Sequence, residues 1–201
     1  MPFANTTQAA PRWTPAALNQ TLTGRFALAL AASLFVAVCA HASVRLPFTP
    51  VPLTLGDFAV VLVGMALGPV FGFAAMLAYL AEGAAGMPVF NPDGGGGLIQ
   101  LLGPTGGYLF AYPLAAAAAG ALVNSLRRVS ASTFLAGLTA AAAGSAIILT
   151  CGFAWLAALP HMSLPLAFSA GVLPFLPGQL VKIAACAGIY ATLSRWREAR
   201  H

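Results

Sequence analysis

Six long apolar segments, separated by short polar or proline-rich stretches, constrain the fold of this chain more than any other feature of its sequence. A helix that crosses a bilayer needs about 20 mostly apolar residues. Only 6% of the 201 residues are charged and 60% are hydrophobic, whereas about a quarter of the residues of a soluble domain carry a charge. The sequence therefore predicts an all-α integral membrane protein with six transmembrane helices, over residues 26–44, 53–68, 71–85, 105–123, 132–159 and 177–193.

Proline and glycine mark the longer connections between these helices. Residues 45–52 hold three prolines, and residues 87–103 include four consecutive glycines. Both stretches are expected to form loops, because proline cannot donate a backbone hydrogen bond and glycine favours turns. The half-apolar stretch 161–176 also contains prolines and is expected to be broken.

The basic residues fall on one side of this six-helix arrangement. Those on the termini and on the connection between the fourth and fifth helices are Arg12, Arg25, Arg127, Arg128, Arg195, Arg197 and Arg200, whereas only Arg45 lies on the opposite connections. Cytoplasmic loops carry the excess of Lys and Arg, so we expect both termini in the cytoplasm. The chain then divides into a cytoplasmic N-terminal segment (1–24), a membrane domain (25–194) and a basic cytoplasmic tail (195–201).

Ionisable and amide side chains in the predicted helices gather near the outer side. Lys182 is the only lysine of the chain, Gln179 precedes it by one helical turn, and Asp57 lies early in the second helix. Charged groups in lipid are costly, so we interpret these residues as an outward-facing pocket in which Lys182 is a cationic anchor for a small anion. The alternative is that they lie at the membrane interface, with Lys182 reaching toward water.

Two further residues fall on the same side of the membrane. Asn91 lies in the outer glycine-rich loop, and Tyr108 begins the fourth helix. They are candidates to line the pocket, and glycines nearby would let the backbone approach a ligand closely. The alternative for Tyr108 is a place in the aromatic belt of the interface.

No motif in the sequence indicates catalysis or metal binding. The phosphate-binding pattern G-x-x-x-x-G-K-[ST] is absent, the three histidines lack metal-ligand spacing, and no nucleophile–base set lies within one region. The basic residues are scattered, which does not indicate binding to nucleic acid. We therefore expect a protein that is not an enzyme, carries no cofactor or metal, and obtains energy from partners.

Five motifs occur in a fixed order along the chain. They are F-T-P-V-P-L-T-L at 48–55, G-M-A-L-G-P at 64–69, Y-L-A-E-G-A-A-G-M-P-V-F at 79–90, G-P-T-G-G-Y at 103–108 and F-L-P-G-Q-L-V-K at 175–182. Together they resemble the BioY family, the biotin-specific S components of energy-coupling factor (ECF) transporters. The resemblance extends from about residue 25 to residue 194.

The resemblance implies an S-component-like bundle in a bacterial cytoplasmic membrane that captures biotin from outside with high affinity. It also implies a transmembrane coupling subunit and two ATPase subunits that drive release inward. The first-helix A-x-x-x-A docking motif of the family maps onto Ala27 and Ala31, and its sixth-helix ligand pair maps onto Gln179 and Lys182. The predicted substrate-binding residues are Lys182, Gln179, Asn91, Tyr108, Gly106, Gly107, Asp57 and Tyr79.

This chain departs from the family pattern at two positions. The family usually has Asp in place of Gln179, and Gln in place of Gly56. The neutral Gln179 removes a charge partner from Lys182, which favours pairing of Lys182 with an anionic ligand, with Asp57 or with Glu82. Two alternatives stay open on the sequence: an S component for another small vitamin-like carboxylate, and a membrane scaffold without a transport role.

Overall fold

The computed structural model describes residues 22–129, 132–160 and 162–199, and over these ranges the chain forms a helical bundle with one short hairpin. Most of the predicted segment 1–24, together with Arg12 and Arg200, lies outside them. The helices are α2 (Leu22–His41), α3 (Gly56–Leu67), α4 (Pro69–Ala84), α5 (Gly97–Leu102), α6 (Gly106–Val129), α7 (Thr133–Ala158), α8 (Leu164–Gly171), the 3-10 helix η1 (Leu173–Phe175) and α9 (Leu176–Glu198). Strands β1 (Ser43–Val44) and β2 (Leu53–Thr54) pair antiparallel.

The six predicted transmembrane segments correspond to α2, α3, α4, α6, α7 and α9. Within the described ranges, four stretches are long and apolar enough to cross a membrane: α2, α6, α7 and the stretch that takes in α8 and α9. Helices α3 and α4 have 12 and 16 residues, so at about 1.5 Å per residue the shorter one measures roughly 18 Å. The predicted all-α membrane fold is confirmed, and two of its six helices are shorter than a full bilayer crossing.

Some element boundaries differ from the prediction. Helix α6 continues to Val129 and α9 to Glu198, because polar residues extend a helix beyond the apolar run that predicted it. The glycine-rich loop contains the short helix α5, which begins at Gly97 after the positive φ of Gly96. The expected break over 161–176 takes the form of α8 followed by η1.

Helix α6 occupies the centre of the bundle and packs against α3, α4 and α7. Glycines allow α3 and α6 to touch through their backbones. A Cβ atom at Gly64 would lie 2.2 Å from the carbonyl oxygen of Ala116, and one at Gly120 would lie 2.5 Å from the carbonyl oxygen of Gly64. Small residues at helix contacts are typical of membrane bundles, where close packing replaces the hydrophobic driving force.

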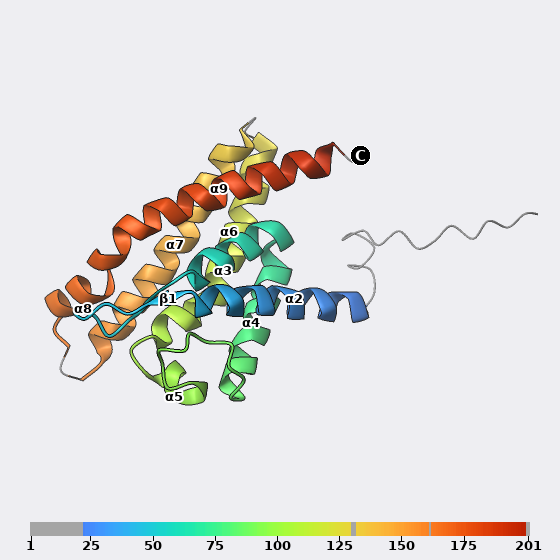
Figure 1. Ribbon diagram of the computed structural model, residues 1–201. Coiled ribbons are helices and arrows are strands. Elements are labelled where there is room, and N and C mark those ends of the chain that lie inside the picture. The colour runs from blue at the N-terminus through green and yellow to red at the C-terminus, as the bar shows by residue number, and fades with distance from the viewer. Residues whose placement is uncertain (1–21, 130–131, 161, 200–201) are drawn as a thin grey trace, which may run out of the picture.

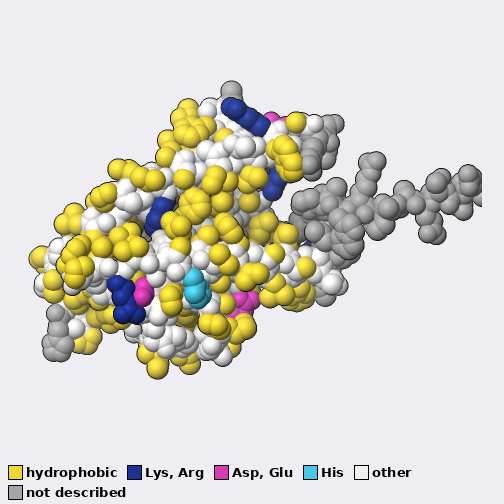
Figure 2. All heavy atoms as spheres, viewed as in Figure 1, with side chains coloured by type: hydrophobic (Ala, Val, Ile, Leu, Met, Phe, Trp, Pro, Cys, Tyr) yellow, Lys and Arg dark blue, Asp and Glu magenta, His cyan; other side chains and the backbone are white. Residues whose placement is uncertain are grey.

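The two ends of the bundle differ in structure. Figure 1 shows the β1 region, α5 and α8 at one end, and the connection between α6 and α7 together with the C-terminus at the other. Between them, hydrophobic side chains cover most of the face in Figure 2, and charged side chains are sparse. Val70 and Val181 are 74% and 70% exposed, which suits contact with lipid.

Candidate ligand-binding site

A cavity lies where the hairpin and the loops meet helices α3, α6, α7 and α9. Its walls therefore come from segments that are distant in sequence, including the proline-rich loop, the glycine-rich loop and η1. The lining residues are Val51, Pro52, Thr54, Asp57, Asn91, Thr105, Tyr108, Leu109, Tyr112, Ile148, Leu149, Phe175 and Lys182.

An ion pair forms part of the cavity wall. The Lys182 ammonium donates to Asp57 Oδ1 at 2.8 Å and to the carbonyl oxygen of Thr54 at 2.6 Å. The two side chains are only 12% and 15% exposed. Helix α9 presents the lysine, and the first turn of α3 presents the carboxylate, where the helix dipole favours a negative charge.

Aromatic and aliphatic side chains form the rest of the wall. The Tyr108 hydroxyl donates to the carbonyl oxygen of Gly171 at 2.7 Å, and its ring lies 6.2 Å from the ring of Phe175. Leu109 and Ile148 are buried. A site of this kind combines an apolar body with a few polar groups that orient a ligand.

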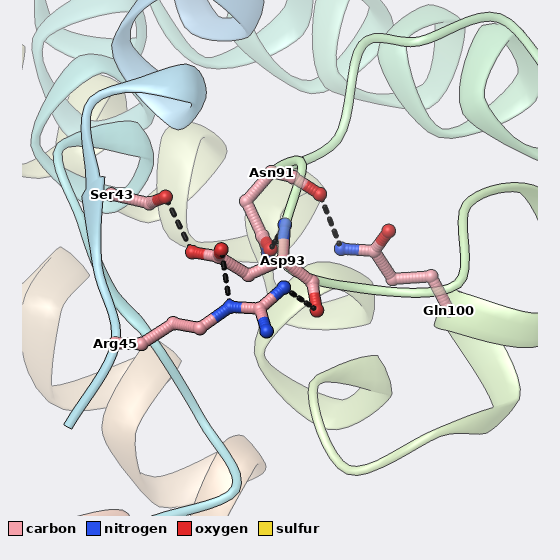
Figure 3. Close-up of polar contacts among 5 residues, drawn as sticks. All are labelled: Ser43, Arg45, Asn91, Asp93 and Gln100. Carbon is pink, nitrogen blue, oxygen red and sulfur yellow. Dashed lines mark hydrogen bonds and ion pairs between the residues drawn. The ribbon is translucent and has the colours of Figure 1, made fainter. Parts of the chain in front are cut away.

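A polar cluster joins the hairpin to the glycine-rich loop beside the cavity (Figure 3). Ser43 donates to Asp93 Oδ2 at 2.6 Å, and the Arg45 guanidinium forms an ion pair with the same carboxylate and donates to the Asp93 carbonyl oxygen. The side-chain oxygen of Asn91 accepts a hydrogen bond from the Asp93 amide, and the backbone oxygen of Asn91 accepts one from the side chain of Gln100. Since Asn91 lines the cavity, this cluster fixes one of its walls.

The ionisation of Asp93 strengthens this cluster. The Ser43 hydroxyl, and after it the Arg45 guanidinium, hold the pKa of Asp93 below its ordinary value of 3.8, against the opposing effect of burial. The carboxylate therefore stays charged over the neutral pH range.

Four of the eight predicted substrate-binding residues line the cavity, and four do not. Lys182, Asp57, Asn91 and Tyr108 belong to the lining, whereas Gln179, Tyr79, Gly106 and Gly107 are buried elsewhere in the bundle.

The residues outside the lining have packing roles that the sequence did not distinguish. Tyr79 donates to the Val89 carbonyl oxygen at 2.9 Å and stacks on Tyr112, which does line the cavity. Gly107 lies against α7, since a Cβ there would be 2.1 Å from Trp155 Cβ. Gln179 is 4% exposed, and its Oε1 atom has no hydrogen-bond partner among the described residues.

The predicted docking residues lie on α2. Ala27 and Ala31 are both exposed, and Ala31 lines an apolar groove between α2, α3 and α9 together with Leu28, Leu62 and Ala66. On another face of α2, the buried Ser33 donates to Glu82 of α4. Glu82 thus pairs with a serine, and Asp57 is the carboxylate that pairs with Lys182.

Sequence reasoning missed several lining residues, among them Thr54, Thr105 and Phe175. All three lie within the motifs at 48–55, 103–108 and 175–182. Their position in these motifs could have marked them as candidate lining residues. Tyr112 follows Tyr108 by one helical turn, which places both on one face.

The cavity has a free volume of about 50 Å³, which is much smaller than the roughly 300–1,000 Å³ of pockets that enclose drug-sized ligands. Entry of a small molecule therefore requires the lining segments to move apart. The proline-rich loop and the glycine-rich loop supply the lining residues Val51, Pro52 and Asn91, which lie outside helices and strands.

Comparisons with known proteins identify the family of the chain. The family model described as "BioY family" matches residues 9–199. The chain is 40% identical to the probable biotin transporter BioY of Pyrococcus horikoshii, over 76% of this chain and 86% of that protein. It is 36% identical to the biotin transporter BioY of Rhodobacter capsulatus, over 89% of this chain and 94% of that protein.

The fold is also similar to a solved structure, the S-component for biotin from an ECF-type ABC transporter. The TM-score is 0.78 at 24% sequence identity, with 88% of this chain and 93% of that chain covered. The shared fold is that of a multi-pass membrane protein. With a family model that spans nearly the whole sequence, the chain belongs to the BioY family.

Proposed function

We propose that this chain is the biotin-capturing S component of a vitamin uptake transporter. The observation that carries the proposal is the largely buried Lys182–Asp57 pair in the wall of a cavity at the loop end of a BioY-family bundle. The relatives are named as biotin transporters, which supports the same ligand.

The substrate contacts are assigned to the polar residues of the cavity. Lys182, Asp57, Asn91 and Tyr108 bind the ligand directly in this proposal. Tyr79, Gly106 and Gly107 hold the walls in place, and Gln179 offers a buried acceptor one helical turn before Lys182. The aliphatic side chains of the lining enclose the apolar part of biotin.

The orientation follows from the basic residues. Both termini lie in the cytoplasm of a bacterial cell and the loop end faces outward, so biotin enters from the extracytoplasmic side. The excess of arginine at the end formed by the α6–α7 connection and the C-terminus of α9 supports this orientation.

Release into the cell requires partners in this proposal. A transmembrane coupling subunit docks on α2 at Ala27 and Ala31, and two ATPase subunits supply ATP hydrolysis. The exposure of both alanines supports the docking assignment. ATP-driven uptake into liposomes is expected only when these subunits are reconstituted together with this chain. ATP-driven uptake by the chain alone would contradict the proposed need for partners.

Isothermal titration calorimetry of the detergent-purified full chain with biotin tests the capture role. The parent protein is expected to bind, and Lys182→Ala is expected to bind at least about tenfold more weakly, because it leaves the largely buried Asp57 carboxylate without its partner. Arg195→Ala, which removes a cation from the same helix far from the cavity, is the control. No heat of binding at micromolar biotin would overturn the proposal, and a panel of other vitamin carboxylates would then identify a different ligand.

A further inference from the structure

An apolar groove on the outside of the bundle lies apart from the ligand cavity, between α2, α3 and α9. We propose that this groove binds an acyl chain of an anionic phospholipid, whose phosphate lies against Arg25 and Arg197. The lipid is then a bound partner of the chain in addition to the ligand of the cavity. The proposal goes beyond the proposed function, since it depends only on the membrane fold and on the residues around the groove.

The groove has the shape and the lining of a site for one hydrocarbon chain. Helix α3 packs against both α2 and α9 and lies between them in Figure 1, so it forms the floor. Leu28 and Phe35 of α2 and Leu193 of α9 belong to the walls, and every lining residue that the structure describes is apolar. The volume is about 300 Å³.

The length of the groove matches one leaflet of a bilayer. From Leu28 to Phe35 it extends roughly 10 Å along α2, at about 1.5 Å per residue. The hydrocarbon core of a bilayer is about 30 Å thick, so the groove covers most of one leaflet. An acyl chain that enters at the end near Leu28 can therefore follow the groove along its whole length.

The position of the groove favours lipid as its occupant. Phe35 and Leu193 are 39% and 38% exposed, so the groove opens onto the outer face of the bundle, where a membrane protein meets lipid tails. An apolar cavity of this kind does not hold water. Ala31, assigned to docking of the coupling subunit, also lines the groove. A docked subunit would displace the acyl chain, so the lipid is expected on the chain alone.

Two arginines mark one end of the groove. Arg197 follows Leu193 by about one turn of α9, and its Nη1 atom donates to the carbonyl oxygen of Ala66, a lining residue in the last turn of α3, at 3.5 Å. The Arg25 guanidinium of α2 lies 5.7 Å from the centre of the Phe71 ring, in the first turn of α4. Both guanidinium groups therefore lie beside the turn that joins α3 to α4.

The charges at this end of the bundle suit a phosphate. Of the four acidic side chains of the sequence, Glu198 is the one at this end, and it pairs with Arg127 of α6. Arginines outnumber acidic residues here, so the local charge is positive. A guanidinium binds phosphate oxygens through paired N–H donors. Basic residues between transmembrane helices, next to an apolar surface, are typical of sites for anionic headgroups.

Native mass spectrometry of the detergent-purified full chain tests the choice of lipid. The protein is mixed with dioleoylphosphatidylglycerol and dioleoylphosphatidylcholine, which have the same acyl chains, so the ratio of retained lipids reports on the headgroup. The parent is expected to retain the anionic lipid at least about fivefold more strongly. Equal retention of the two lipids would overturn the proposal.

The double variant Arg25→Gln/Arg197→Gln tests the assigned cations. Retention of phosphatidylglycerol is expected to fall at least about tenfold, because both contacts to the phosphate are lost. Arg128→Gln/Arg195→Gln loses the same net charge and is the control, since Arg195 lies roughly 200° around α9 from Arg197. Equal losses in the two double variants would show general attraction by positive charge and would overturn the proposal.

Thermal unfolding in the same detergent shows whether each double variant is folded. If Arg25→Gln/Arg197→Gln does not fold, the single variant Arg197→Gln decides, with an expected loss in retention of about threefold or more.

Ala31→Phe tests the place of the acyl chain. Ala31 is exposed and lines the groove, so a phenylalanine there narrows the groove and leaves both arginines in place. Retention of phosphatidylglycerol is expected to fall at least about fivefold. Ala185→Phe changes an exposed alanine of α9 outside the groove lining and should retain lipid as the parent does. Unchanged retention in Ala31→Phe would mean that the headgroup alone is held, and the groove would not be the lipid site.

Discussion

Tyr108 Oη donates a hydrogen bond of 2.7 Å to the carbonyl oxygen of Gly171. This contact joins the cavity-lining face of α6 to the C-terminal end of α8. Thr49, in the proline-rich loop, donates to the neighbouring carbonyl oxygen of Ala170 at 2.6 Å. The short helix α8 is thus tied both to the wall of the cavity and to the loop that borders it, which links the position of α8 to the shape of the site.

Tyr108→Phe should weaken both the fold and the binding of biotin. The buried hydroxyl is removed and the Gly171 carbonyl oxygen loses its donor, which is expected to cost about 1 kcal/mol of unfolding free energy. Because α8 becomes less tightly held, biotin affinity should fall by about threefold or more. Thermal unfolding in detergent and calorimetry measure the two effects. Tyr190→Phe, which alters a buried tyrosine outside the cavity lining, is the control, and equal binding losses in both variants would contradict the prediction.

Gly107→Ala should destabilise the contact between α6 and α7. The added Cβ would lie 2.1 Å from Trp155 Cβ and 2.7 Å from the Cys151 carbonyl oxygen, so the two helices must separate. Overpacking of this kind costs about 1–3 kcal/mol. Gly188→Ala, on α9, meets nothing within 4 Å and should stabilise that helix by up to about 1 kcal/mol. Thermal unfolding compares the two, and a stable Gly107→Ala protein would show that the glycine is not there for packing.

The sequence predicts more of the fold than of the cavity and its lining. Apolar runs of helical length predicted α2, α6, α7 and α9 because lipid leaves the backbone few other structures. The pairing of Lys182 with Asp57 joins residues that are 125 positions apart, and it depends on how α3 and α9 pack, which no local pattern encodes. Glycine was ambiguous for a related reason: Gly107 could equally serve a ligand or a neighbouring helix, and only the contact with Trp155 decides between them.

The Asp93 cluster should stabilise the two loops beside the cavity in a pH-dependent way. The pKa of Asp93 is lowered below 3.8 in the folded protein, so the stabilisation is fully present above that pH and is lost as the pH falls through the folded-state pKa. Asp93→Asn is expected to lower the unfolding temperature slightly at pH 7, with a free-energy loss below about 1 kcal/mol, since exposed ion pairs contribute little.

The difference in unfolding temperature between Asp93→Asn and the parent should shrink as the pH is lowered below 3.8. Differential scanning calorimetry at a series of pH values follows it. Glu198→Gln breaks an ion pair at the other end of the bundle and controls for the general effect of losing a surface charge. A difference for Asp93→Asn that persisted at the lowest pH would mean that the carboxylate charge is not what holds the loops together.

Ser33→Ala should loosen the attachment of α2 to α4 without changing the cavity. Ser33 is 1% exposed and donates to Glu82, and in the described structure neither residue belongs to the cavity lining. A hydrogen bond to a carboxylate contributes about 1.5–3 kcal/mol, and its loss leaves Glu82 without this donor. Ser169→Ala removes an exposed hydroxyl that bonds within its own helix and should cost much less. Thermal unfolding measures the stability of both variants, and biotin binding should stay within about threefold of the parent in both. If Ser33→Ala were no less stable than Ser169→Ala, the Ser33–Glu82 bond would not be what secures the helix that carries Ala27 and Ala31.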